Sequence, residues 1–123
     1  MQRPGQRFGK GRKRKERGTM NGLEKAYSIV LEDRRLNGEI DSWHYEAFKL
    51  LVAEPPNALR SYLTVDFAVY LNDMTLEFHE CKGYMEKDAL QRLKAAAGLW
   101  PHKFVLVERN RKKDGGGWKL TEF

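Results

Sequence analysis

Cysteine is almost absent from the chain, since Cys81 is the only one among its 123 residues. A single thiol cannot form an internal disulfide or a multi-cysteine zinc site, so zinc held by cysteine is excluded and a reducing cytoplasm is the natural compartment. The sequence also lacks an apolar run of the roughly 20 residues that a membrane span needs, and no signal-peptide apolar core follows Met1. We therefore expect a soluble, cytoplasmic protein with no membrane partner.

Excess positive charge is missing from most of the chain. The formal net charge is +6, but residues 1–18 contain eight basic side chains and one acid, a net charge of +7, which leaves −1 for the remainder. The eight basic residues are Arg3, Arg7, Lys10, Arg12, Lys13, Arg14, Lys15 and Arg17. This segment is rich in glycine and has no apolar periodicity, which predicts a disordered basic arm over residues 1–18 and one folded domain over residues 19–123.

Basic arms of this kind neutralise the phosphates of nucleic acids, so the eight side chains are candidate nucleic-acid contacts. Three plainer interpretations compete with this one. In the first the arm is a solvated tail, in the second it is a localisation signal, and in the third it is a stretch of residues ahead of a second start at Met20.

Hydrophobic periodicity predicts an α/β fold. Asn21 and Glu24 have the spacing of a capping box, and apolar residues at helical spacing follow as far as Asn37-Gly38. Helical spacing returns over residues 87–99. Residues 40–52 carry both helix and strand signals, and we assign them to a strand. Further strands are predicted over residues 62–71, 75–81 and 104–107, with a last one over 118–123. The expected core has the order αβββαβ, a mixed central sheet flanked by helices.

The turn signal at Asn72-Asp73 predicts a hairpin. With a three-residue loop, Asp66 lies directly across from Glu80, and facing carboxylates with Cβ atoms about 5 Å apart repel one another unless a cation compensates them. Side chains alternate along a strand, so Lys82 shares the face of Glu80 while Cys81 points to the opposite face. A slip of one residue would place Asp66 opposite His79 instead.

Two carboxylates and an amine on one face suit metal-assisted hydrolysis of a phosphodiester. Mg²⁺ or Mn²⁺ binds one or two carboxylates plus waters, and the amine can steady negative charge on the phosphate. The isolated motif also has a simpler interpretation, in which Glu80 and Lys82 are a solvated pair and Glu24 only caps a helix. His79 and Cys81 are better explained as packing residues than as ligands or a nucleophile.

The order of these residues adds specificity. Glu24, then Val65-Asp66, then Glu80-Cys81-Lys82 before a helix resembles the PD-(D/E)XK nuclease superfamily, with Val65 in place of the proline. More closely, several stretches resemble a small family of phage and prophage proteins described as endonucleases or Holliday-junction-resolvase-like. These stretches are GEIDSWHYEAFKL, YLTVDFAVY, HECKG and LQRLKAAAGLWPHKFVLVE, and the resemblance covers about residues 21–108.

The resemblance implies a site built from four catalytic residues, Glu24, Asp66, Glu80 and Lys82. The implied metal ligands are Asp66, Glu80, Glu24 and the backbone carbonyl of Cys81, and the implied ion is Mg²⁺ or Mn²⁺. Arg92 and Lys94 match basic positions on the second helix of the phage family, which makes them candidate nucleic-acid contacts; they are otherwise ordinary surface charges.

The implied activity is that of a metal-dependent, structure-selective DNA endonuclease, a phage Holliday-junction resolvase acting on four-way junctions in the host cytoplasm. Because a junction needs two symmetric cuts, we expect a homodimer. Three alternatives stay open at this point. They are a duplex or nicking endonuclease with the same centre, a non-catalytic DNA-binding module, and an enzyme that acts on RNA.

Overall fold

The computed structural model describes residues 18–53, 60–83 and 87–123, with the backbone alone for residues 87–89. The predicted basic arm lies outside the described residues except for Gly18. The elements, in chain order, are α1 (Gly22–Leu36), β1 (Ser42–Tyr45), β2 (Lys49–Ala53), β3 (Ser61–Thr64), β4 (Phe67–Tyr70), β5 (Leu76–Cys81), α2 (Lys87–Leu99), β6 (Lys103–Arg109), the 3₁₀ turn η1 (Lys112–Asp114) and β7 (Trp118–Glu122). None of the helices in these ranges is both long and apolar enough to span a membrane.

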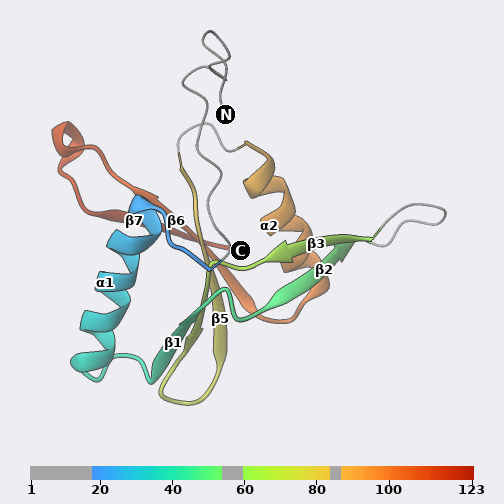
Figure 1. Cartoon of the computed structure of the whole chain (residues 1–123), viewed down its shortest axis with the longest axis horizontal. Helices are drawn as coiled ribbons and strands as arrows, with labels where there is room; N and C mark the ends of the chain where they lie inside the picture. Colours follow the sequence, from blue (N-terminus) through green and yellow to red (C-terminus); the bar gives the residue numbers. More distant parts are fainter. Residues whose placement is uncertain (1–17, 54–59, 84–86) are drawn as a thin grey trace, which may run out of the picture.

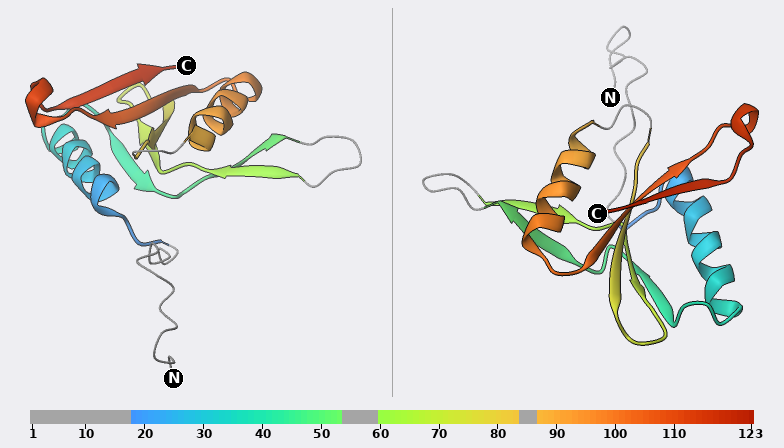
Figure 2. Two further views of the ribbon diagram at one scale, coloured as in Figure 1. Left: turned by 90° about the horizontal axis from the view of Figure 1, so that it is seen from above. Right: turned by 180° about the vertical axis from the view of Figure 1, so that it is seen from behind.

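A five-stranded mixed sheet forms the centre, in the order β1-β4-β5-β6-β7 (Figure 1). Its one parallel pair is β5–β6, and the crossover between these two strands is made through α2. Strands β2 and β3 form a separate antiparallel hairpin that projects beside α2 (Figures 1 and 2). The predicted fold class, a mixed sheet with helices packed on it, is confirmed.

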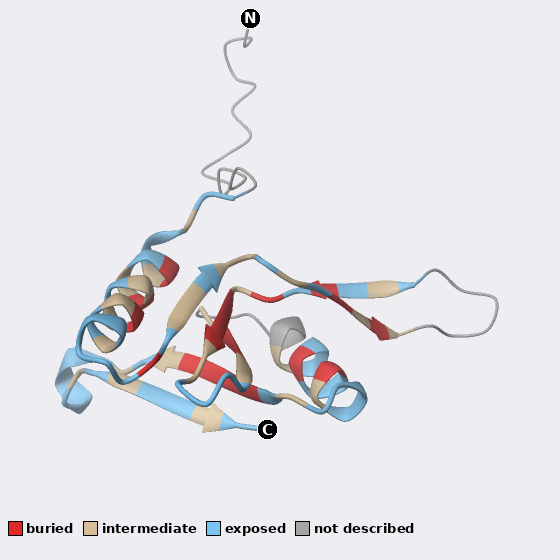
Figure 3. Ribbon diagram, turned by 90° about the horizontal axis from the view of Figure 1, so that it is seen from below, coloured by how far each residue is buried: buried red, intermediate tan, exposed pale blue. Residues whose placement is uncertain are grey.

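The central strands separate two hydrophobic cores. Phe67 and Cys81 pack on the side covered by α1, whereas Phe78 and Leu106 pack on the side covered by α2 and the β2–β3 hairpin. In Figure 3 the buried segments accordingly follow the central strands and the sheet-facing sides of both helices. Cys81 therefore points away from the α2 side, as the alternation along β5 predicts.

The hairpin of β4 and β5 has the predicted register. Leu71 N–H donates to the carbonyl of Thr75 at 2.9 Å, and Phe67 pairs with His79. The three-residue loop ends at Met74, whose φ of 68° is the left-handed conformation that such a loop requires at its last position. The alternative register, slipped by one residue, is excluded.

The predicted element order αβββαβ is wrong in its number of strands. Residues 40–52 form two strands, β1 and β2, and residues 62–71 form two more, β3 and β4. The members of each pair belong to different sheets. The described part of the chain therefore has the order αβββββαββ.

A β-bulge is the physical reason for both breaks. Beyond the pair Tyr45–Phe67 of one ladder and before the pair Lys49–Thr64 of the next, the three residues 46–48 face only the two residues 65–66. Glu46 N–H donates to the carbonyl of Asp66 at 2.9 Å, so the two strands stay joined across the bulge. An extra residue bends the strand that carries it, which directs the β2–β3 hairpin away from the sheet and against α2.

Candidate metal and catalytic site

Asp66 and Glu80 meet where β4 begins and β5 ends. The backbone N–H of Asp66 donates to Oε1 of Glu80 at 2.9 Å, and the backbone N–H of Cys81 donates to Oδ2 of Asp66 at 2.9 Å. Each carboxyl group thus accepts a hydrogen bond from the backbone of the opposite strand. These reciprocal bonds extend the hairpin one position beyond Phe67 and His79, and they confirm that the two acids face each other.

Glu24 brings a third carboxyl group from the start of α1. Its Oε1 accepts from Asn21 N–H at 2.9 Å, and Asn21 Oδ1 accepts from Glu24 N–H at 2.8 Å, so the predicted capping box is confirmed. Glu24 is only 4% exposed, and it also accepts the hydroxyl of Tyr45 at 2.9 Å. Tyr45 pairs with Phe67, the neighbour of Asp66, which ties the helix start to this end of the sheet.

Burial raises the pKa of both facing acids. For Asp66, burial is the largest cause of the raised pKa, followed by the charge of Glu80 and a hydrogen bond with it, and then by the charge of Glu24 and a hydrogen bond with it. For Glu80, burial and the charge of Glu24 raise the pKa, while hydrogen bonds with Asp66 and the charge of Arg92 lower it. The three predicted acids therefore lie close enough to share a proton and to repel one another when ionised.

Lys82 follows Glu80 by two residues, the spacing that puts side chains on one face of a strand. Its backbone N–H donates to the carbonyl of Val107 at 2.9 Å, which holds the end of β5 against β6. Within the part of the chain that the structure describes, no ion pair joins the Lys82 ammonium to Asp66 or Glu80. The role of Lys82 in catalysis remains a prediction.

The donor set suits a hard cation. Among residues 18–53, 60–83 and 90–123, no group of three or more His, Cys, Asp or Glu side chains is arranged to hold a metal ion. Mg²⁺ does not need such a cage, because it binds through one or two carboxylates and completes its shell with waters and substrate oxygens. Asp66 and Glu80 supply two carboxylates whose repulsion such an ion would relieve. Glu24 and the Cys81 carbonyl remain predicted additional ligands.

The two predicted basic contacts on α2 are both exposed. One of them bears on the site acids, because the charge of Arg92 lowers the pKa of Glu80. Arg92 therefore lies within electrostatic reach of the site. The predicted contacts in the arm, from Arg3 to Arg17, lie outside the described residues.

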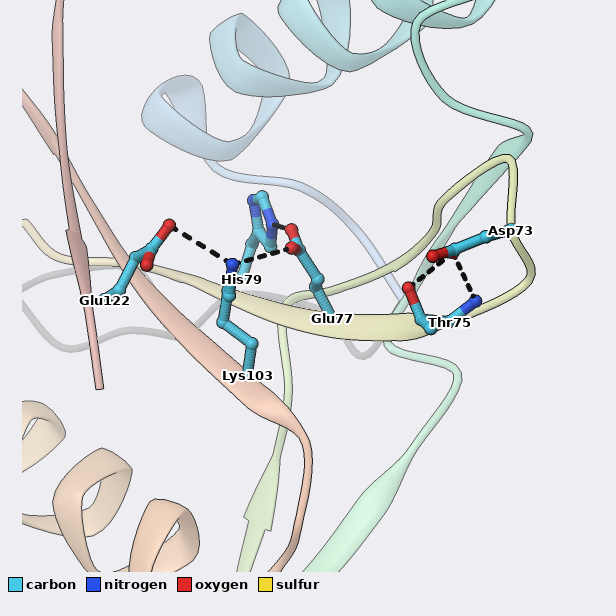
Figure 4. Close-up of polar contacts among 6 residues, drawn as sticks. All are labelled: Asp73, Thr75, Glu77, His79, Lys103 and Glu122. Atoms are coloured by element: carbon cyan, nitrogen blue, oxygen red, sulfur yellow. Dashed lines mark hydrogen bonds and ion pairs between the residues drawn. The ribbon is translucent and has the colours of Figure 1, made fainter.

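Sequence reasoning missed a buried polar chain that anchors α1 to β5. His79 is 1% exposed; its Nδ1 lies 2.6 Å from the hydroxyl of Tyr27, and its Nε2 lies 3.0 Å from Oε1 of Glu77. Lys103 completes the chain with an ion pair to Glu77 at 3.6 Å (Figure 4). Tyr27 lies one helical turn after Glu24, so this chain also fixes the helix that delivers Glu24. The available signal was an acid two residues before His79, on the same face of the strand.

Metal-free protein should be less stable at pH 8 than at pH 5. The pKa values of Asp66 and Glu80 are raised in the folded state, so the folded state binds these protons more tightly than the unfolded chain does. Their contribution to the free energy of unfolding is complete below the carboxyl pKa of the unfolded chain, and it is lost as pH rises toward the raised folded-state pKa values. Thermal melts in EDTA at both pH values measure this, with Asp66→Asn as the control that should flatten the dependence. A wild-type melting temperature that does not fall from pH 5 to pH 8 would contradict the account.

Tyr27→Phe should destabilise the fold by about 1–3 kcal/mol, because it removes the hydroxyl and leaves Nδ1 of buried His79 without this partner. Urea unfolding measures the loss. Tyr62→Phe is the matched control, since Tyr62 is 39% exposed and its ring is retained. Equal stability of the two variants would show that the Tyr27–His79 bond does not anchor the helix.

Comparison of the chain with protein-family models, with curated proteins and with solved structures finds no match. What the site can do is therefore inferred from its own geometry. That geometry consists of two facing acids, the half-buried Asp66 and the buried Glu80, a third acid from α1, and an amine two residues beyond Glu80.

Proposed function

We propose that the protein is a metal-dependent, structure-selective DNA endonuclease that hydrolyses phosphodiester bonds, of the Holliday-junction-resolvase type. The observation that carries the proposal is the meeting of Asp66 and Glu80 at a strand end, with Glu24 beside them. The order of these residues resembles that of PD-(D/E)XK nucleases. The mixed sheet between α1 and α2 supports the same assignment.

Asp66 and Glu80 would hold Mg²⁺ or Mn²⁺, with Glu24 and the Cys81 carbonyl as further oxygen donors. When bound, the ion supplies a water of lowered pKa and polarises the scissile phosphate. Lys82 steadies the negative charge that develops on the phosphate oxygens. The hydrogen bonds from the backbone N–H groups of residues 66 and 81 fix the orientation of the two carboxylates before substrate arrives.

Two sites related by two-fold symmetry would make the paired cuts that a four-way junction needs, so we propose a homodimer acting on branched DNA. A duplex or nicking endonuclease would use the same residues. A non-catalytic DNA-binding module would need none of the acids, and an RNA substrate would offer the same phosphates. The next two experiments distinguish these outcomes.

Asp66→Ala, Glu80→Ala and Lys82→Ala should each reduce cleavage in Mg²⁺ by about a hundredfold or more, because each removes a group that acts on the reacting phosphate. Rates on a labelled four-way junction measure this. Asp33→Ala removes an exposed carboxylate of α1 and should cut at the wild-type rate. Melting curves establish that each variant folds. Cleavage at the wild-type rate by any of the first three variants would show that the assigned residue is not catalytic, and absence of cleavage by the wild-type protein would favour the non-catalytic module.

Binding to a four-way junction should outlast binding to linear duplex as salt rises. Residues 19–123 carry a net charge of −1, so non-specific affinity comes mainly from the arm and is weakened by salt. A fixed pair of sites instead selects DNA by the angle between its arms. Gels with Mg²⁺ should show symmetric pairs of cuts near the branch point, and gels with EDTA should show none. Comparable cutting of linear duplex would favour the general endonuclease, and cleavage of RNA alone would favour the RNA enzyme.

A further inference from the structure

A groove of about 390 Å³ separates the β2–β3 hairpin from α2. We call it the hairpin–α2 groove. Its lining residues are Val52, Ala53, Ser61, Gln91, Arg92 and Ala95. Figures 1 and 2 show α2 packed across the β2–β3 hairpin. Among the described lining residues Arg92 is the one charged group, and its charge is positive.

Packing below the groove fixes the distance between its walls. Leu50 and Leu63 of the hairpin share a buried core with Leu93 of α2. At the end of α2, the indole N–H of Trp100 donates to the carbonyl of Leu51 at 2.9 Å. Apolar packing and a hydrogen bond thus hold the hairpin against the helix. The groove is therefore a built feature of the fold.

Arg92 connects the groove with the candidate site. The hairpin leaves the main sheet at the bulge opposite Asp66, and Arg92 lowers the pKa of Glu80 through its charge. Arg92 thus lines the groove and also acts on a site acid. A strand whose phosphate lies at Asp66 and Glu80 can continue along the groove with Arg92 beside it.

A second hollow, on the α1 side of the sheet, has the opposite electrostatic character. Its lining includes four acids, Glu39, Asp73, Glu77 and Glu122, against the guanidinium of Arg34. Figure 4 shows three of these acids, Asp73, Glu77 and Glu122. Lys103 pairs with Glu77 and Glu122, and Arg34 pairs with Glu39. The described residues that line this hollow therefore offer no unpaired cation to a phosphate, whereas the guanidinium of Arg92 in the hairpin–α2 groove attracts one.

We propose that the hairpin–α2 groove holds the backbone of one nucleic-acid strand next to the scissile phosphate. Arg92 contacts a phosphate, while the amide of Gln91 and the hydroxyl of Ser61 hydrogen-bond to backbone oxygens. Arginine, glutamine and serine are residue types that commonly make such contacts. The inference rests on the proposed nuclease function, and it makes the β2–β3 hairpin the element that guides the strand.

Arg92→Gln tests the groove by binding alone. Fluorescence anisotropy with a labelled four-way junction in EDTA should show an affinity about tenfold lower than wild type, the effect of losing one charge-assisted hydrogen bond. The slope of log K against log salt should become shallower by about 0.9. Arg92→Lys should keep most of the affinity, and Gln91→Glu should weaken binding, because it places a carboxylate in the groove.

Arg111→Gln is the matched control. Arg111 is also an exposed arginine, and it precedes η1 at the turn between β6 and β7, away from α2 (Figure 1). Its loss should leave the affinity close to wild type. Lys94→Gln should lose less than Arg92→Gln, since Lys94 is not among the groove's lining residues.

The outcomes separate the groove from the nuclease. If Arg92→Gln and Arg111→Gln bind with equal affinity and the wild-type protein cleaves DNA in Mg²⁺, the proposal that the groove holds a strand would be overturned. The proposed nuclease function would still stand. If only the groove variants lose affinity and the wild-type protein does not cleave DNA in Mg²⁺, the groove would be supported as a nucleic-acid interface and the nuclease function would be overturned. Absence of any binding by the wild-type protein would overturn both.

Discussion

Two carboxyl groups that accept backbone hydrogen bonds from each other's strand are the constraint on which the rest of the structure depends. Asp66 and Glu80 accept hydrogen bonds from backbone N–H groups beside the bulge that interrupts the regular ladder, and N–H groups that are partly removed from water need such partners. The same closeness makes ionisation of both acids unfavourable. A protonated pair or a bound cation resolves that conflict, so the feature that completes the backbone bonding would also favour the metal ion that we propose.

The surrounding elements are arranged around this pair. On one side, α1 is held by the Glu24–Tyr45 bond at its start and by the Tyr27–His79 bond one turn later. On the other side, the bulge directs the β2–β3 hairpin against α2, which brings Arg92 within electrostatic reach of Glu80. The sheet therefore supplies Asp66 and Glu80. The helix on each face, α1 with Glu24 and α2 with Arg92, supplies a charge that shifts their pKa values.

The features that could be predicted are those whose cause lies in adjacent residues or in a single turn. The capping box of Asn21, the bounds of α2 and the β4–β5 register that places Asp66 across from Glu80 belong to this group. The bulge could not be predicted, because residues 40–52 become two strands only through the register of a partner strand. The Tyr27–His79 bond joins residues 52 positions apart, and the one local signal near it, the acid two residues before His79, does not identify Tyr27 as the partner. The basic arm, the metal ion and the nuclease activity remain predictions.

Proton release on metal binding is the most direct test of the central claim, that the Asp66–Glu80 pair is a cation site. Because burial and mutual repulsion raise the pKa of both acids, metal-free protein holds a proton there that an incoming ion must displace. Calorimetric titration of Mn²⁺ at pH 7 in two buffers of different ionisation enthalpy measures that proton. The account predicts binding with proton release in the wild-type protein and the loss of both in Glu80→Gln. Equal Mn²⁺ binding by the two proteins, or wild-type binding without proton release, would contradict it.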